Sequence, residues 1–172
     1  MNQKNNGIVK RAGSRSDTQA EVESHVLEVL SQRFGLQLVS GKVDTGRSFV
    51  QLDGLAIDRE RNIAVAVEVF AHAGRVKAAQ RHKVHADVFK LALVRSLLRD
   101  QGIADVTAVF AFTCLECARS LTGRTWIADA ASRYGVQSVS IEIPTELTSK
   151  ILEAQARQNL IETKVEVNNG DI

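Results

Sequence analysis

The sequence predicts an α/β domain built on a mixed central β-sheet that is flanked by helices. Runs typical of β-strands recur at 36–43, 48–58, 62–70, 105–113 and 136–143. Helical periodicity separates the later runs, first over 75–100 and then over 115–134. With 172 residues, 44% of them hydrophobic, the chain is long enough for one domain with a substantial core.

The first predicted helix follows a polar stretch. Residues 1–16 show no hydrophobic period and carry the basic side chains of Lys4, Lys10, Arg11 and Arg15. We therefore expect a flexible basic arm there. The letters SDTQ at 16–19 have the spacing of a capping box, which predicts a helix from this point to Phe34, closed by Gly35.

The remaining segments complete the predicted order αβββαβαβα. The turn-like letters DTGR and RERN join the first three strands, so these strands are expected to form a meander. The last predicted strand is broken by Pro144, and a helix over 146–164 follows it. The predicted boundaries are a single domain over 17–164 and a frayed tail over 165–172.

Composition and charge exclude some classes of function. The net charge of +2 is too small to identify a partner. No apolar stretch is long enough to cross a bilayer, and the first residues lack the apolar segment of a signal peptide, so we expect a cytoplasmic protein with no membrane partner. The sequence has no glycine-rich phosphate loop and no GxSxG elbow, which excludes the common nucleotide-dependent and acyl-transfer enzymes.

Two carboxylates lie inside neighbouring apolar strands. Asp53 interrupts the run at 48–58, and Glu68 interrupts the run at 62–70. A buried carboxylate without a partner costs several kcal/mol or takes up a proton, so each of them requires a cation or a donor. Strand alternation puts Asp53 on one face with Gln51 and Leu55, and it puts Glu68 among small alanines that leave room above the sheet.

The helices add further polar groups to this region. At 100° per residue, Glu23 falls within the apolar arc of the first helix. On the long helix, Gln80, Lys83 and Asp87 share a band about 60° wide that continues into the apolar face. We therefore expect three carboxylates, a glutamine and a lysine to converge on the sheet.

Two interpretations of this convergence are open. In the structural one, Asp53 hydrogen-bonds a turn, Glu68 pairs with a basic residue such as Lys83, and Glu23 extends to solvent. In the functional one, the like charges are held close together and a divalent cation offsets their repulsion.

The order of elements and these residues resemble the PD-(D/E)xK nuclease superfamily. The resemblance covers roughly residues 17–143: a first helix with an inward Glu, a strand with Asp, a next strand with Glu, and then helix, strand, helix and strand. It implies a restriction-endonuclease-like fold, metal-dependent hydrolysis of DNA and Mg²⁺ or Mn²⁺ as the cofactor. A homodimer is a further expectation, because many nucleases of this fold pair up to cut two strands.

The resemblance also assigns roles to residues of this chain. Asp53 and Glu68 would be metal ligands, assisted by Glu23. Gln80 matches a glutamine that many relatives carry in the helix after the motif.

The motif lysine, two positions after the Glu, is replaced here by Phe70, which cannot orient a water molecule. Lys83 is the predicted substitute, with Lys77 second. The alternative is a catalytically degenerate member that binds nucleic acid or protein without cutting.

Further residues could bind phosphate or a metal ion. The basic side chains expected to flank the site are Lys42, Arg47, Arg75, Lys77, Arg81, Arg119 and Arg124. They suit a phosphate backbone, with solvated surface as the alternative for each of them. The CxxC at Cys114 and Cys117 is expected to be packed rather than redox-active, and its order and separation from His82 and His85 match no structural zinc pattern.

Overall fold

The structure is a computed structural model that describes residues 15–168, with side chains for 17–78 and 80–157. Its elements in chain order are α1 (Arg15–Phe34), β1 (Val39–Asp44), β2 (Phe49–Asp58), β3 (Ile63–Phe70), α2 (Ala78–Asp100), β4 (Asp105–Phe112), α3 (Leu115–Thr122), α4 (Trp126–Arg133), β5 (Val136–Ser140) and α5 (Thr145–Asn168). The predicted α/β class is confirmed, and so is the mixed sheet flanked by helices.

The five strands lie side by side in the order β1-β2-β3-β4-β5. The pairs β1–β2 and β2–β3 are antiparallel, as expected for strands joined by short turns. The pairs β3–β4 and β4–β5 are parallel, because a helical crossover returns the chain to the same end of the sheet each time. The sheet therefore changes from antiparallel to parallel at β3.

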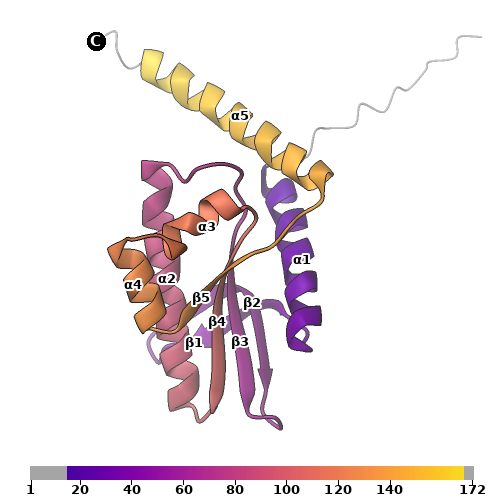
Figure 1. Cartoon of the computed structure of the whole chain (residues 1–172), viewed down its shortest axis with the longest axis vertical. Coiled ribbons are helices and arrows are strands. Elements are labelled where there is room, and N and C mark those ends of the chain that lie inside the picture. The colour runs from indigo at the N-terminus through magenta and orange to yellow at the C-terminus, as the bar shows by residue number, and fades with distance from the viewer. Residues whose placement is uncertain (1–14, 169–172) are drawn as a thin grey trace, which may run out of the picture.

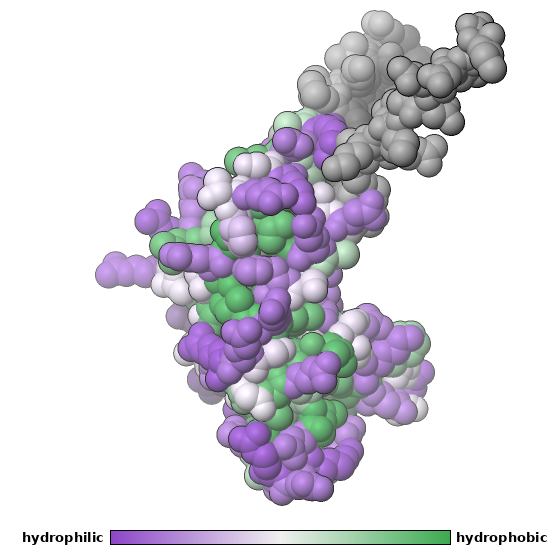
Figure 2. All heavy atoms as spheres, turned by 90° about the vertical axis from the view of Figure 1, so that its right-hand side faces the viewer, coloured by the Kyte–Doolittle hydropathy of each residue, from purple (hydrophilic) through white to green (hydrophobic). Residues whose placement is uncertain are grey.

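Helices cover both faces of the sheet (Figure 1). On one face, α1 packs Val22, Val26 and Leu30 against valines of β3 such as Val67. On the other face, α2, α3 and α4 bury the second cluster, which includes Phe110 of β4. Seen from the α1 side, the surface is mixed, with hydrophobic residues showing between hydrophilic ones (Figure 2).

Several boundaries differ from those expected. Arg15 is already helical, so Ser16 lies inside α1 rather than before its start. The helix α5 continues to Asn168, four residues into the segment 165–172 that was expected to be frayed. The rest of that tail, and the basic arm expected over 1–16 as far as residue 14, lie outside the described residues.

The segment 115–134, expected to be one helix, is two. The helix α3 ends where Gly123 adopts an extended backbone, with φ of −84° and ψ of −179°. Thr125 then caps α4, because its hydroxyl oxygen accepts a hydrogen bond from the Ala128 amide. A glycine followed by a capping threonine ends one helix and starts the next.

This cap predicts a modest and specific loss of stability. Thr125→Ala removes the acceptor for an orphan amide and should lower the free energy of unfolding by about 1 kcal/mol in urea denaturation. Thr122→Ala is the matched control, because Thr122 is an exposed threonine whose hydroxyl donates to the Ala118 carbonyl inside a helix. The control should change stability by less than about 0.5 kcal/mol. Equal losses in the two variants would contradict the capping role.

The CxxC lies at the start of α3. Cys114 is the N-cap residue, and its sulfur accepts a hydrogen bond from the Cys117 amide. Cys117 is buried, and its sulfur contacts the Gly74 carbonyl at 2.9 Å. Burial raises the pKa of the Cys117 thiol well above its usual range, which opposes formation of a reactive thiolate.

Candidate active site

The strands β2 and β3 separate beside Asp53. They pair only from Gly54 to Asp58 on β2 and from Ile63 to Val67 on β3. Beyond that point the Val69 amide finds no strand partner and donates instead to Asp53 Oδ2, at 2.8 Å. A carboxylate therefore occupies the place of a backbone carbonyl, and the sheet opens between the two strands.

A register shift lies beside this opening. The pairing of β1 with β2 is irregular between Val39 and Gly41, opposite the stretch that holds Asp53. Leu52 and Leu55 pack on the same core cluster although they are three residues apart. Alternation is therefore broken at Asp53, and the expectation that Gln51 and Leu55 share one face is wrong because of this shift.

Gly54 brings α1 close to the opening. A Cβ at this position would lie 2.4 Å from Leu27 Cδ2 and 3.2 Å from Val67 Cβ. The lack of a Cβ at Gly54 leaves room for the Leu27 side chain of α1 to lie directly on β2, next to Asp53.

Glu68 lies on β3, next to Val69, and is 1% exposed. Its Oε2 is 2.7 Å from Lys90 Nζ, whereas Oε1 is buried without a hydrogen-bond partner among the described residues. Burial raises the pKa of Glu68 to about 7, and the negative charges of Asp53 and Asp87 add to this effect against the opposing influence of Lys90. A buried carboxylate oxygen without a donor is an available ligand atom.

Two lysines of α2 reach this region. Lys90 Nζ contacts both Glu68 and Asp87, the latter at 3.4 Å. Burial acts to lower the pKa of Lys90, but its hydrogen bonds and charge interactions with Glu68 and Asp87 outweigh this, and the net shift is upward. Lys83 Nζ donates to Asp87 Oδ2 at 2.6 Å, and its side chain is half exposed. Asp87 therefore joins the two lysines into one network.

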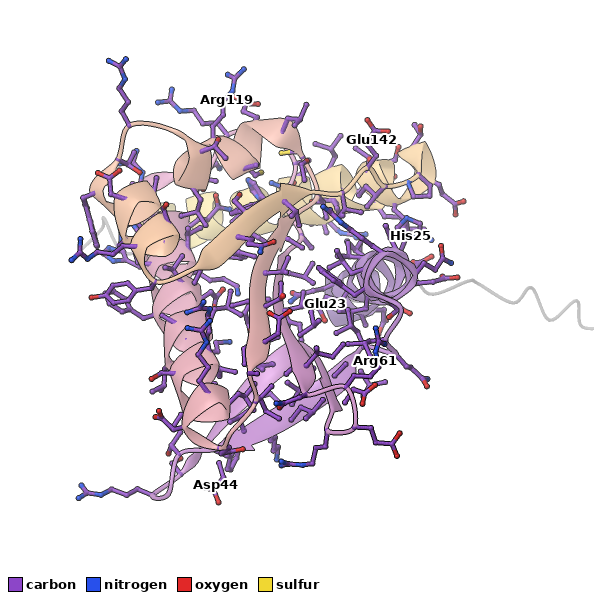
Figure 3. All side chains as sticks on the ribbon, turned by 60° about the horizontal axis from the view of Figure 1, so that its bottom comes forward. Glu23, His25, Asp44, Arg61, Arg119 and Glu142 are labelled. Atoms are coloured by element: carbon purple, nitrogen blue, oxygen red, sulfur yellow. The ribbon has the colours of Figure 1, made fainter. Side chains whose placement is uncertain are left out.

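Glu23 approaches from the opposite face of the sheet. It lies on the side of α1 that faces the sheet (Figure 3), and its Oε1 accepts a hydrogen bond from Gln19 at 2.7 Å. Burial raises the pKa of Glu23. The hydrogen bond from Gln19 and the charge of Lys83 act against this, and the charge of Asp53 adds to it. These interactions place Glu23 within electrostatic reach of groups on β2 and on α2.

The predicted residues are brought together in part. The charge of Asp53 acts to raise the pKa values of both Glu68 and Glu23, and the charge of Lys83 acts to lower that of Glu23. Gln80 is engaged elsewhere, because its Oε1 accepts from the Lys77 amide and its Nε2 lies 3.3 Å from His72 Nδ1. The structural interpretation is also met in part, because Asp53 accepts a backbone hydrogen bond and Glu68 pairs with a lysine.

Sequence reasoning missed Lys90. On a helical projection it falls about 20° beyond Lys83, just outside the band drawn from Gln80 to Asp87. Extending that band by one more turn would have included it.

Phe70, which replaces the motif lysine, belongs to the core. It is 5% exposed and packs against Phe110 and Phe112, with ring centroids 6.5 Å and 5.8 Å away. A lysine at this position would bury its charge among aromatic rings, so the core fixes the residue type here.

The predicted nucleic-acid-binding residues fall into two regions. Lys42 lies on β1 with its Nζ 4.2 Å from the centre of the Phe49 ring, and Arg47 lies in the turn before β2. Lys77 and Arg81 lie at the start of α2. All four side chains are exposed.

A buried histidine lies next to the site. His72 is the second residue after the end of β3 and is 6% exposed. Gln155 Nε2 lies 2.8 Å from its Nδ1. The amide of His72 donates to Thr113 Oγ1 at 3.0 Å. Burial lowers the pKa of His72 below its usual value of 6.5.

This shift predicts a loss of stability in acid. The folded state favours the neutral ring, so below pH about 6.5 the unfolded chain binds a proton that the folded chain does not. The free energy of unfolding should therefore fall as the pH drops through this range, and His72→Gln should reduce the slope in urea titrations at several pH values. His82→Gln, which changes an exposed ring on α2, is the control. An unchanged slope in the His72 variant would contradict the assignment.

The residues in the opening fit a divalent cation of the Mg²⁺ type. Such ions keep several waters and take only one or two carboxylates from a protein, together with substrate phosphate oxygens. Asp53 and Glu68 Oε1, which has no hydrogen-bond partner among the described residues, could supply two oxygen ligands. Within the described residues, no group of three or more His, Cys, Asp and Glu side chains is arranged to hold a metal by itself.

Comparisons with known proteins give no further guide. No protein-family model matches the sequence, and no curated protein or solved structure matches it either. In the part of the chain that the structure describes, every helix is too short or too polar to cross a membrane. We therefore infer the function from the geometry of the opening between β2 and β3.

Proposed function

We propose that this chain hydrolyses phosphodiester bonds in DNA, with Mg²⁺ or Mn²⁺ held by Asp53 and Glu68. The observation that carries the proposal is the buried, unpartnered Oε1 of Glu68 beside Asp53, where β2 and β3 separate. The restriction-endonuclease-like arrangement is part of the same proposal, and the element order and the resemblance support it.

The side chains around the opening can divide the work of hydrolysis. When bound, the metal ion offsets the negative charge that develops on the phosphate and makes water a better nucleophile. Asp53 is fixed by the Val69 amide, so it presents its other oxygen in a set direction. Glu23 extends the negative site from α1 and can accept a hydrogen bond from an ordered water.

We assign the role of the missing motif lysine to Lys90. Its Nζ lies 2.7 Å from the proposed metal ligand Glu68, so Lys90 puts a positive charge next to that carboxylate. Lys83 is more exposed and is held by Asp87, which suits a contact to substrate phosphate. The earlier expectation for Lys83 stays a prediction, and single substitutions of the two lysines will separate the roles.

A second candidate function is binding of nucleic acid without cleavage. The observation that favours it is the ion pair of Glu68 with Lys90, which offsets the buried charge in the absence of metal. In this case Asp53, Glu68 and Lys90 have a structural role. The exposed basic residues Lys42, Arg47, Lys77 and Arg81 then bind the nucleic acid.

One assay separates the two functions. Purified protein is incubated with supercoiled plasmid and with linear single-stranded and double-stranded DNA, in Mn²⁺, in Mg²⁺ and in EDTA. We expect cutting with metal and none in EDTA, lost in Glu68→Gln and retained in Glu142→Gln, an exposed glutamate outside the opening. Absence of cutting, with DNA binding retained in a gel shift, would support the second function instead.

A further inference from the structure

A cavity of about 620 Å³ lies on the other side of α2 from the carboxylates. It is open to solvent on one side and is lined by residues of the loop 71–77, the first half of α2, and the helices α3 and α4. Residues of its lining that bear charge or an aromatic ring are Arg75, Arg81, His85, Glu116, Arg119 and Trp126. Asp53, Glu68 and Glu23 do not line it. Its volume is typical of pockets that hold a small organic ligand.

Three arginines from three segments line this cavity. Arg75 comes from the loop before α2, Arg81 from α2 and Arg119 from α3, where its side chain extends outward (Figure 3). All three are exposed, and no carboxylate of the described residues lies within 4 Å of their guanidinium groups. Guanidinium groups match the geometry of phosphate oxygens, and no carboxylate in the described part of the chain neutralises them here.

An aromatic side chain stands beside these charges. Trp126, at the start of α4, is 62% exposed although it is the largest apolar side chain type. The ring of His85 meets it edge-on, with centroids 5.0 Å apart and planes at 62°. The histidine therefore holds the indole in place and leaves much of the ring accessible to a stacking partner.

We propose that this cavity binds one nucleotide unit of a single-stranded nucleic acid, with its phosphate on the three arginines and its base stacked on Trp126. The proposal rests on the proposed function, because it names the strand that the carboxylates would act on. A duplex keeps its bases stacked inside, so only an unpaired base can reach the indole face. Glu116 supplies an acceptor for a base amino group or a sugar hydroxyl.

The position of the cavity suits a strand that continues to the opening between β2 and β3. On α2, Arg81 and His85 lie about 160° to 200° around the helix from Lys83, so the cavity and the carboxylate network occupy its two sides. The loop 71–77 joins both, because it follows β3, which carries Glu68, and contributes Arg75 to the cavity. A strand passing over this loop would contact both sites.

The sequence contains a built-in reporter for this cavity, because Trp126 is its only tryptophan. Intrinsic fluorescence is therefore recorded while the protein is titrated with a short oligothymidylate in EDTA, which prevents cutting. Parallel titrations use thymidine monophosphate, inorganic phosphate and a duplex of the same length. We expect saturable quenching by the oligothymidylate, weaker quenching by the mononucleotide, and none by phosphate alone or by the duplex.

Substitutions separate the phosphate contacts from the stacking contact. The variant R75A/R81A/R119A should reduce the magnitude of the slope of log affinity against log salt by about 0.7, because the three arginines contact one phosphate of a single strand. The control R33A/R59A/R99A removes the same charge from exposed positions at the C-terminal ends of α1 and α2 and just after β2, and should keep the slope close to that of the wild type. With a labelled oligonucleotide, Trp126→Ala should weaken binding by about 5- to 150-fold, and Trp126→Phe should restore most of it. Circular dichroism confirms that each variant is folded.

Each outcome bears on the proposal. Quenching that is lost in R75A/R81A/R119A and kept in its control supports the cavity as a nucleotide site. Oligonucleotide binding without any change in Trp126 fluorescence overturns it, as does equal quenching by phosphate or by the duplex. The cleavage assay decides the proposed function separately, because loss of cutting in Glu68→Gln does not depend on Trp126.

Discussion

Asp53→Asn should reduce metal-dependent cleavage at least about 100-fold, which corresponds to about 2.7 kcal/mol of transition-state stabilisation. Asparagine has the same shape, and its amide oxygen can still accept the hydrogen bond from Val69, so the opening between β2 and β3 should keep its form. The variant loses the negative charge that a divalent cation requires beside Glu68. Initial rates of plasmid cutting in Mn²⁺ measure the effect.

Metal binding can be followed in the same variant without any substrate. Millimolar Mg²⁺ or Mn²⁺ should raise the melting temperature of the wild-type protein and leave that of Asp53→Asn unchanged, because only a ligand that binds the folded state stabilises it. Asp105→Asn, at the exposed start of β4, is the control and should respond as the wild type does. Undiminished cutting by Asp53→Asn would remove Asp53 from the metal site.

Lys90→Met should lower the free energy of unfolding by about 3 kcal/mol above neutral pH, because it leaves a buried carboxylate without a partner. The side chain of Lys90 is 29% exposed, whereas that of Glu68, which its ammonium group contacts, is 1% exposed. The unpaired charge therefore cannot be solvated in the folded state. Urea denaturation at several pH values measures the loss.

The loss should depend on pH in a defined direction. The pKa of Glu68 is already raised to about 7 in the folded protein, and removing Lys90 raises it further. A raised carboxylate pKa contributes stability that is present below the unfolded value of 4.5 and is lost as the pH rises through the folded pKa. The variant should therefore be closest to the wild type in acid and fall behind it as the pH rises.

Two further variants control this result. Lys83→Met changes a lysine on the same helix that is 52% exposed, and Asp87 retains Lys90, so it should cost less than about 1 kcal/mol. Lys90→Met combined with Glu68→Gln removes both charges and should recover much of the stability. Equal costs for Lys83→Met and Lys90→Met would show that the pair with Glu68 is not the reason.

The sequence predicted the fold well where local signals agree with the packing. The apolar runs, the turns DTGR and RERN, and the periodicity of α2 indicate the strands and helices with boundaries close to those observed. It failed at 115–134, where Gly123 and Thr125 divide a segment whose apolar period runs through both helices. A period shows which face is buried, but a local cap decides where a helix stops.

The sequence indicated the carboxylates of the candidate site but not the lysine that pairs with Glu68. Asp53 and Glu68 stand out because charge is rare inside apolar strands, and Glu23 stands out for the same reason on α1. The contact of Lys90 with Glu68 depends on how α2 lies across β3, which no local pattern specifies. Trp126 and the arginines of α2 and α3 line one cavity only because the tertiary structure brings these helices together.

The bond from the Val69 amide to Asp53 makes this amide a natural probe of the site. In a regular sheet the amide would be held by a carbonyl, whose charge never changes. Here it is held by the carboxylate of Asp53, the proposed metal ligand. The nitrogen and proton chemical shifts of Val69 in an NMR spectrum should therefore report the binding of a metal ion to Asp53, with no label other than nitrogen-15.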